Sequence, residues 1–141
     1  MLAVLVGCKK FDPEKQAEID EDIIVQYIAD HGLTALSSPT GLHWTVDSTG
    51  TGVQPNSGNS VRVYYKGYLT SGATFDESDA NGLSFPLTSV IQGWQEGIPK
   101  YHEGGGGKLL IPSALGYGND EVGTIPANSV LIFDVHLIEV Q

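Results

Sequence analysis

The stretch Val61-Arg62-Val63-Tyr64-Tyr65-Lys66-Gly67-Tyr68-Leu69 alternates between two kinds of side chain, with Val61, Val63, Tyr65 and Leu69 in one phase. A period of two predicts a β-strand whose first phase faces a core while the second faces solvent. Residues 130–140 alternate more strongly still, and their apolar phase consists of Leu131, Phe133, Val135 and Leu137. The two segments predict antiparallel strands with one buried face.

Shorter extended segments are expected around these two strands. They comprise residues 42–46, 83–87 and 108–111. Phe75 and Asp76 instead open a polar, glycine-containing loop, and a longer loop covers residues 112–128. Glycine and small polar residues favour turns over strands, so both of these segments are predicted to be irregular.

One short helix is expected in residues 90–99. A helix of one or two turns is stable only when tertiary contacts support it, so Ile91, Trp94 and Ile98 are expected to pack against the sheet. The combination predicts an α+β fold, in which a curved antiparallel sheet wraps around the short helix. Such an arrangement leaves a pocket between sheet and helix.

The residues before this domain predict an amphipathic helix. Asp12 is a candidate N-cap, Pro13 suits the first helical position, and Gly32 is a candidate terminator. The apolar residues at helical spacing are Ile19, Ile23, Ile24, Tyr27 and Ile28. The opposite face carries Glu14, Glu18, Glu21 and Asp22. We expect this acidic face to be solvated and the apolar stripe to pack on the domain or on a second copy of the chain.

Residues 1–8 predict the end of a lipoprotein signal, residues 9–40 a helix and linker, and residues 41–141 the folded domain. Leu5-Val6-Gly7-Cys8 resembles a bacterial lipobox, in which the signal is cut before the cysteine and the thiol of Cys8 is lipidated. A lipid would anchor the protein to a membrane of the bacterial cell envelope without spanning it. Because no basic segment precedes the apolar residues, either the signal starts upstream of Met1 or the cysteine lies by chance in the N-terminus of a soluble protein.

Composition and spacing exclude several classes of function. The 141 residues carry a net charge of −10, which repels a phosphate backbone, so no nucleic-acid partner is expected. A single cysteine excludes an internal disulfide and a cysteine-based zinc site, and none of the four histidines is paired at helical spacing. The run Gly104-Gly105-Gly106-Gly107-Lys108-Leu109 lacks the spacing of a phosphate-binding loop. Neither a metal nor a cofactor is expected.

Five ordered blocks carry a more specific signal. They are Val63-Tyr64-Tyr65-Lys66-Gly67-Tyr68-Leu69, Gly72-Ala73-Thr74-Phe75-Asp76, residues 90–97, residues 110–112 with 115–118, and residues 125–135. In this order they resemble the FKBP-type peptidyl-prolyl cis–trans isomerases, and the resemblance covers about residues 41–141. It is specific because all five blocks occur at the spacing of the family, whereas any one block alone would be weak.

The resemblance implies a pocket for a substrate proline ring, with Trp94 as its floor. The residues implied as its walls and rim are Tyr65, Phe75, Val90, Ile91, Phe133 and, from an overhanging loop, Ile125. The backbone N–H of Ile91 and the hydroxyl of Tyr117 would bond substrate carbonyls. Asp76 would either tune the electric field in the pocket or mainly hydrogen-bond neighbouring groups, and the second interpretation is favoured. Leu83 stands where the family often has an aromatic residue.

The function that the resemblance implies is isomerisation of Xaa-Pro bonds in unfolded or exported polypeptides, which assists their folding. A macrolide is a further ligand that it suggests. Two other hypotheses stay open at this point. One is a binding module of the same fold that recognises proline-containing or hydrophobic segments without catalysis. The other is a lipoprotein scaffold whose acidic helix engages a partner.

Overall fold

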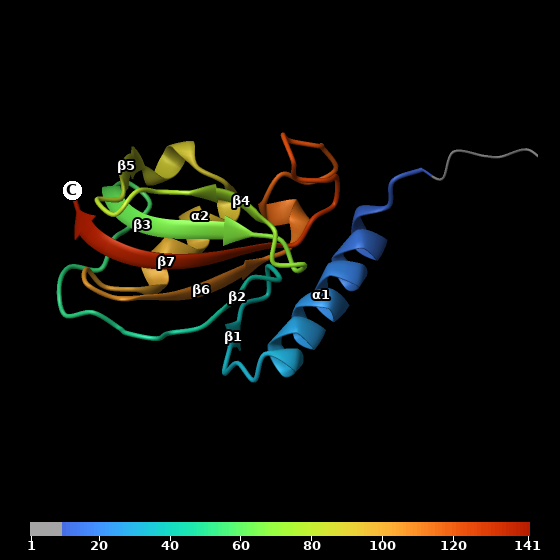
Figure 1. The fold of residues 1–141 in the computed structure, drawn as a ribbon, viewed down its shortest axis with the longest axis horizontal. Coiled ribbons are helices and arrows are strands. Elements are labelled where there is room, and N and C mark those ends of the chain that lie inside the picture. The colour runs from blue at the N-terminus through green and yellow to red at the C-terminus, as the bar shows by residue number, and fades with distance from the viewer. Residues whose placement is uncertain (1–9) are drawn as a thin grey trace, which may run out of the picture.

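Strands β3 (Ser60–Tyr68) and β7 (Leu131–Val140) pair along their whole length at the centre of a curved antiparallel sheet (Figure 1). The computed structural model describes residues 10–141. Tyr65 lies opposite Val135 and Gly67 opposite Phe133. The phase predicted to be buried is buried within both strands, with Val61, Val63 and Leu137 fully inaccessible to solvent, whereas Leu69 follows the end of β3 and is half-buried.

Within the described residues, five more strands complete the sheet, and two α-helices and three 3-10 turns lie beside it. The strands are β1 (Leu36–Ser37), β2 (His43–Trp44), β4 (Thr74–Glu77), β5 (Leu83–Pro86) and β6 (Gly106–Ile111). The strand order across the whole sheet is β1-β2-β6-β7-β3-β4, and β5 also pairs with β3. The helices are α1 (Pro13–Asp30) and α2 (Gln92–Gly97), with 3-10 turns η1 (Leu87–Ser89), η2 (Ile98–Lys100) and η3 (Ser113–Leu115). The predicted α+β fold, a curved antiparallel sheet around a short helix, is confirmed.

Helix α2 lies close against strand β6 because two of its residues are glycines. A Cβ atom on Gly93 would lie 2.6 Å from Ile111 Cγ2, and one on Gly97 would lie 2.7 Å from Leu109 Cδ2. The close approach lets Trp94, which is 4% exposed, pack into the core of the sheet. Packing, not length, therefore stabilises this helix of 6 residues, as expected from the sequence.

Helix α1 begins and ends where the sequence predicts. Oδ1 of Asp12 accepts hydrogen bonds from the backbone N–H groups of Glu14 and Lys15. After the helix, Gly32 has a φ of +61°, a left-handed conformation that glycine adopts without strain. The cap and the terminator are therefore both confirmed.

The burial of helix α1 differs from the prediction. Of the predicted apolar stripe only Ile24 is fully buried, against Leu110 and Val130, whereas Ile19 and Ile23 are 43% and 38% exposed. The helix meets the domain along a narrow line, so only residues on that line are covered. One turn before Ile24 on this line lies Asp20, which is 1% exposed although it is acidic.

Three local expectations were wrong. Phe75 and Asp76 belong to strand β4, which pairs with β3 on both sides of a bulge, and not to a loop. Ser37, expected in the linker that follows the helix, lies in β1, and β6 begins at Gly106, two residues before the expected start. Edge strands of 2 to 4 residues with mostly exposed side chains lack the alternation that identifies a strand.

Within residues 10–141, no helix has the length and apolar character needed to cross a membrane. Cys8 and the predicted lipobox lie outside the described residues.

Candidate active site

A cavity of about 270 Å³ opens between the sheet and helix α2. Its lining residues come from most of the elements on that side of the sheet: Tyr65, Phe75, Asp76, Leu83, Phe85, Ser89, Val90, Ile91, Trp94, Tyr117 and Phe133. Apolar pockets with a few polar groups at their edge are typical of binding sites for small groups.

The indole of Trp94 is held by three rings. Its ring centroid lies 4.9 Å from that of Tyr65 and 5.1 Å from that of Phe133, both nearly perpendicular to it, and 5.3 Å from that of Phe85. Edge-to-face contacts of this kind stabilise one orientation of the ring. Trp94 Nε1 is buried and has no hydrogen-bond partner among residues 10–141. The indole still lines the cavity, so one surface of it remains available to a guest.

Gly67 allows two of the aromatic walls to meet. A Cβ atom at this position would lie 2.7 Å from Phe133 Cε1 and 2.8 Å from Phe75 Cε1. Without it, the rings of Phe75 and Phe133 pack edge-to-face with centroids 5.5 Å apart. Gly67 does not line the cavity, yet the shape of the cavity depends on it.

The polar edge of the cavity is formed by Tyr65 and Asp76. The Tyr65 hydroxyl donates a 2.8 Å hydrogen bond to Asp76 Oδ2. Burial of the phenol, and then this bond and the negative charge of Asp76, raise the pKa of Tyr65 well above its usual value. The Tyr65 hydroxyl therefore stays protonated, and the carboxylate of Asp76 is engaged by it.

Two further donors of the lining have no partner within residues 10–141. The backbone N–H of Ile91 precedes the first turn of helix α2 and makes no hydrogen bond there, although the Ile91 carbonyl accepts from Trp94 and Gln95. Tyr117 is 37% exposed, and its hydroxyl makes no hydrogen bond to another of these residues. Both groups are available to the carbonyl oxygens of a bound chain.

Comparison with known proteins decides the family. Residues 52–138 match the family model described as FKBP-type peptidyl-prolyl cis-trans isomerase. The chain belongs to this family. The curated FkpA isomerase of Aeromonas hydrophila is 43% identical over 107 residues, which are 74% of this chain and 40% of that protein. The chain therefore spans about two fifths of the length of such relatives.

Solved structures of the family share the fold. The crystal structure of FkpA from Escherichia coli superposes with a TM-score of 0.78 at 40% identity and covers 91% of this chain and 62% of that one. An isomerase from Pseudomonas syringae gives a TM-score of 0.79 at 29% identity, with 94% and 98% covered. Both matches extend over most of the chain, beyond the segment that matches the family model.

The structure brings most of the predicted FKBP site residues to one cavity. The residues found there are Tyr65, Phe75, Asp76, Val90, Ile91, Trp94, Tyr117 and Phe133. Ile125 is not among the lining residues: it is 6% exposed, packs with the core and forms a tight turn with Val122. Phe85 and Ser89 line the cavity but were not predicted, although the spacing of Leu83 and Phe85 on strand β5 offered a signal for Phe85.

Within residues 10–141, no three histidine, cysteine, aspartate or glutamate side chains are arranged to hold a metal ion. The residues that face the cavity are rings, aliphatic side chains and single hydrogen-bonding groups. A lining of this kind is typical of a site that binds a ligand through apolar contact and a few hydrogen bonds.

Proposed function

We propose that residues 41–141 form an isomerase domain that catalyses cis–trans isomerisation of Xaa-Pro bonds in unfolded or exported polypeptides. The observation that carries the proposal is the ring-lined cavity of about 270 Å³ above Trp94, with two unused hydrogen-bond donors at its edge. Membership of the FKBP family supports the same activity. By speeding a slow folding step, the domain would assist the folding of its clients.

The chemistry asked of the site is rotation about one bond. Resonance gives the amide a rotational barrier of about 18–20 kcal/mol, and X–Pro bonds interconvert over tens of seconds or longer. The planar amide is more dipolar than the twisted one, so a dry, ring-lined cavity solvates the planar form less well than water does. Lowering the barrier by about 5–8 kcal/mol accelerates the rotation roughly 10⁴- to 10⁶-fold.

In the proposed complex the proline ring lies on Trp94, between Tyr65 and Phe133. The N–H of Ile91 and the hydroxyl of Tyr117 donate hydrogen bonds to carbonyl oxygens of the client and hold the chain while the proline turns. Phe75 and Val90 extend the walls, and the loop of Ile125 covers one side.

Asp76 has a less direct role in this proposal. Its carboxylate accepts the hydrogen bond of Tyr65 and so fixes the phenol ring that stands edge-on to Trp94. This geometry supports the interpretation that Asp76 mainly bonds its neighbours, and it assigns no proton transfer to the carboxylate.

Further ligands and the location of the protein belong to the same proposal. A macrolide would occupy the cavity in competition with a proline peptide, although Leu83 offers a lower wall than an aromatic residue would. Residues 1–8 would end in a lipidated Cys8 that tethers the domain to a membrane of the cell envelope, with residues 9–40 as helix and linker. Mass spectrometry of the native N-terminus tests the lipid, and peptide displacement tests the macrolide.

Refolding of a protein limited by prolyl isomerisation tests the activity. Catalytic amounts of the wild-type chain should shorten the slow refolding phase, and Trp94→Ala should abolish the effect. Trp44→Phe is the matched control, because Trp44 lies outside the cavity beneath Lys100 Nζ, 4.5 Å from its ring centroid. Tyr117→Phe serves if Trp94→Ala does not fold. A wild-type chain that binds the unfolded protein without shortening the slow phase would favour a binding module instead.

A further inference from the structure

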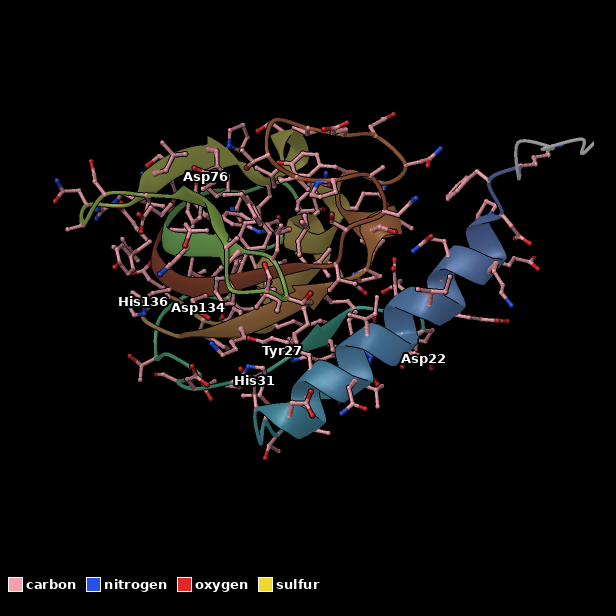
Figure 2. All side chains as sticks on the ribbon, turned by 45° about the vertical axis from the view of Figure 1, so that its right-hand side comes forward. Asp22, Tyr27, His31, Asp76, Asp134 and His136 are labelled. Atoms are coloured by element: carbon pink, nitrogen blue, oxygen red, sulfur yellow. The ribbon has the colours of Figure 1, made fainter. Side chains whose placement is uncertain are left out.

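We propose that Asp20 of helix α1 is a positioning residue for Tyr117, so that the N-terminal helix helps to shape a site that it does not line. The inference rests on the proposed function, because it assigns Tyr117 a hydrogen bond to the client. Figure 2 shows Asp22 and Tyr27 of helix α1 well away from Asp76 at the cavity edge. Any influence of the helix on the site must therefore pass through an intervening segment.

The carboxylate of Asp20 is buried and fully engaged. Its Oδ2 accepts a 2.9 Å hydrogen bond from the backbone N–H of Ser113 and a 2.5 Å bond from the Ser113 hydroxyl. Its Oδ1 accepts a 2.8 Å bond from Gln16 Nε2. Burying a carboxylate costs free energy unless such bonds replace those to water. Removing the carboxylate should therefore leave the N–H and hydroxyl of Ser113 without partners and displace this residue.

Ser113 in turn organises the backbone on both sides of Tyr117. Its carbonyl oxygen accepts hydrogen bonds from the N–H of Gly116 at 3.0 Å and of Gly118 at 2.7 Å. The carbonyl of Gly118 accepts a 2.8 Å bond from Asn128 N–H. A displacement of Ser113 is therefore transmitted to the two residues that flank Tyr117.

The hydroxyl of Tyr117 is not fixed by a hydrogen bond. Tyr117 is 37% exposed and lines the cavity, and its hydroxyl bonds no group among residues 10–141. The position of the hydroxyl therefore depends on the packing of the ring and on the backbone between Ser113 and Gly118. Misplacing a positioned group by about 1 Å can cost about 100-fold in rate, so a loosened loop matters for catalysis.

Hydrogen bonds to Asp20 join the helix to this loop. Figure 1 shows η3 and the loop after it beside helix α1. A void of about 170 Å³, lined in part by Ala17, Asp20 and Ser113, remains between the two segments. Across this void, the two hydrogen bonds between Asp20 and Ser113 link the helix directly to the loop.

The neighbouring residue supplies a matched control. Glu21 Oε2 lies 3.0 Å from Nε2 of His43 on strand β2, so Glu21 also links helix α1 to the sheet. Its carboxylate bonds His43 and makes no hydrogen bond to the loop that carries Tyr117. Glu21→Ala should therefore loosen the helix without moving the hydroxyl.

The first measurement is kcat/KM for isomerisation of a short Xaa-Pro peptide by the full chain. We expect Asp20→Ala to lower kcat/KM about tenfold. Asp20→Asn keeps an acceptor for Ser113 and should retain most of the activity. Glu21→Ala should change kcat/KM less than about twofold. In a Tyr117→Phe background, Asp20→Ala should cost less than about twofold, because the hydroxyl that it positions is already absent. A purely structural role would give equal losses in both backgrounds.

The second measurement is amide hydrogen exchange, which needs no activity. Exchange at Gly116 and Gly118 should accelerate at least about tenfold in Asp20→Ala and stay unchanged in Glu21→Ala. If Asp20→Ala does not fold, Ser113→Ala replaces it, with a smaller loss of about threefold in kcat/KM because the N–H bond to Asp20 remains. An active wild type whose Asp20→Ala variant keeps full kcat/KM, or loses it equally in both backgrounds, overturns the positioning role alone. An inactive wild type overturns the proposed function first.

Discussion

The hydroxyl of Tyr65 donates a 2.8 Å hydrogen bond to Oδ2 of Asp76, across the bulged pairing of strands β3 and β4. The bond connects the buried ring of Tyr65 on strand β3 to the exposed edge strand β4. It places a carboxylate at the rim of an otherwise apolar cavity and at the same time gives that carboxylate a partner. The shape of the cavity and the protonation of Tyr65 are therefore linked.

Replacing Asp76 should make Tyr65 more acidic. Burial raises the pKa of Tyr65, and Asp76 raises it further through the hydrogen bond and its charge. In Asp76→Asn the charge is removed and the phenolate is less disfavoured, so the pKa of Tyr65 should fall, while burial keeps it above its usual value. Ultraviolet titration of tyrosine ionisation, with Tyr65→Phe used to assign the signal, measures the change. An unchanged titration in Asp76→Asn would show that the charge has no such effect.

The free energy of unfolding should fall at alkaline pH. Burial is the main cause that raises the pKa of Tyr68 to about 12 and the pKa of Tyr101 further still. In the unfolded chain these phenols lose protons near pH 10, so above that pH the unfolded state binds fewer protons and is favoured. The stabilisation is complete below about pH 10 and is lost as the pH rises through about 12.

Urea unfolding between about pH 8 and pH 12 checks this dependence. Tyr101→Phe should reduce the alkaline fall in unfolding free energy, whereas Tyr64→Phe, at a ring that is 49% exposed, should leave it unchanged. Equal slopes for the wild type and Tyr101→Phe would contradict the assignment.

Gly97→Ala should destabilise the protein even though alanine favours helices. Alanine gains about 1 kcal/mol in helix propensity over glycine, but its Cβ would lie 2.7 Å from Leu109 Cδ2. Overpacking of this kind costs about 1–3 kcal/mol, so we expect a net loss in the free energy of unfolding. Gln92→Ala, at an exposed position of the same helix, is the control and should be close to neutral. A more stable Gly97→Ala variant would show that strand β6 yields to the methyl group.

Gly67→Ala should lower the affinity for a proline peptide by more than a general loss of stability would. Its Cβ would meet both Phe133 and Phe75 and force their rings apart. Gly72→Ala is a useful control, because Gly72 has a φ of +92° and a Cβ atom there would meet no other part of the chain within 4 Å, so the change strains the backbone without touching the cavity. Isothermal titration with a proline peptide should give a clearly larger dissociation constant for Gly67→Ala only. Equal dissociation constants for the two variants would show that the shape of the cavity does not depend on Gly67.

Sequence patterns predict those parts of the fold in which the conformation favoured by neighbouring residues is also the one that tertiary packing requires. The alternation in strands β3 and β7 follows from burial on one face, and Asp12 and Gly32 act on the ends of helix α1 through bonds and conformations within a few residues. The aromatic residues of the cavity were found through the order and spacing of whole blocks, because each ring taken alone resembles a core residue.

Long-range geometry accounts for what the sequence did not predict. Asp20 sits among acidic residues of a predicted solvated helix, and its bonding to Ser113, 93 positions away, leaves no local pattern. Strand β4 is short and exposed, so only its pairing with β3 identifies it. In the sequence, Gly67 looks like any other residue of an alternating strand. Its role appears only when the positions of the Phe75 and Phe133 rings are known.

The exchange rate of a short Xaa-Pro peptide, followed by two-dimensional exchange NMR with substoichiometric protein, tests the central claim most directly. The account predicts that the wild-type chain accelerates cis–trans exchange far above the uncatalysed rate, and that Trp94→Ala, confirmed as folded, does not. Peptide resonances that shift on binding to the wild-type chain while the exchange rate stays at its uncatalysed value would contradict it.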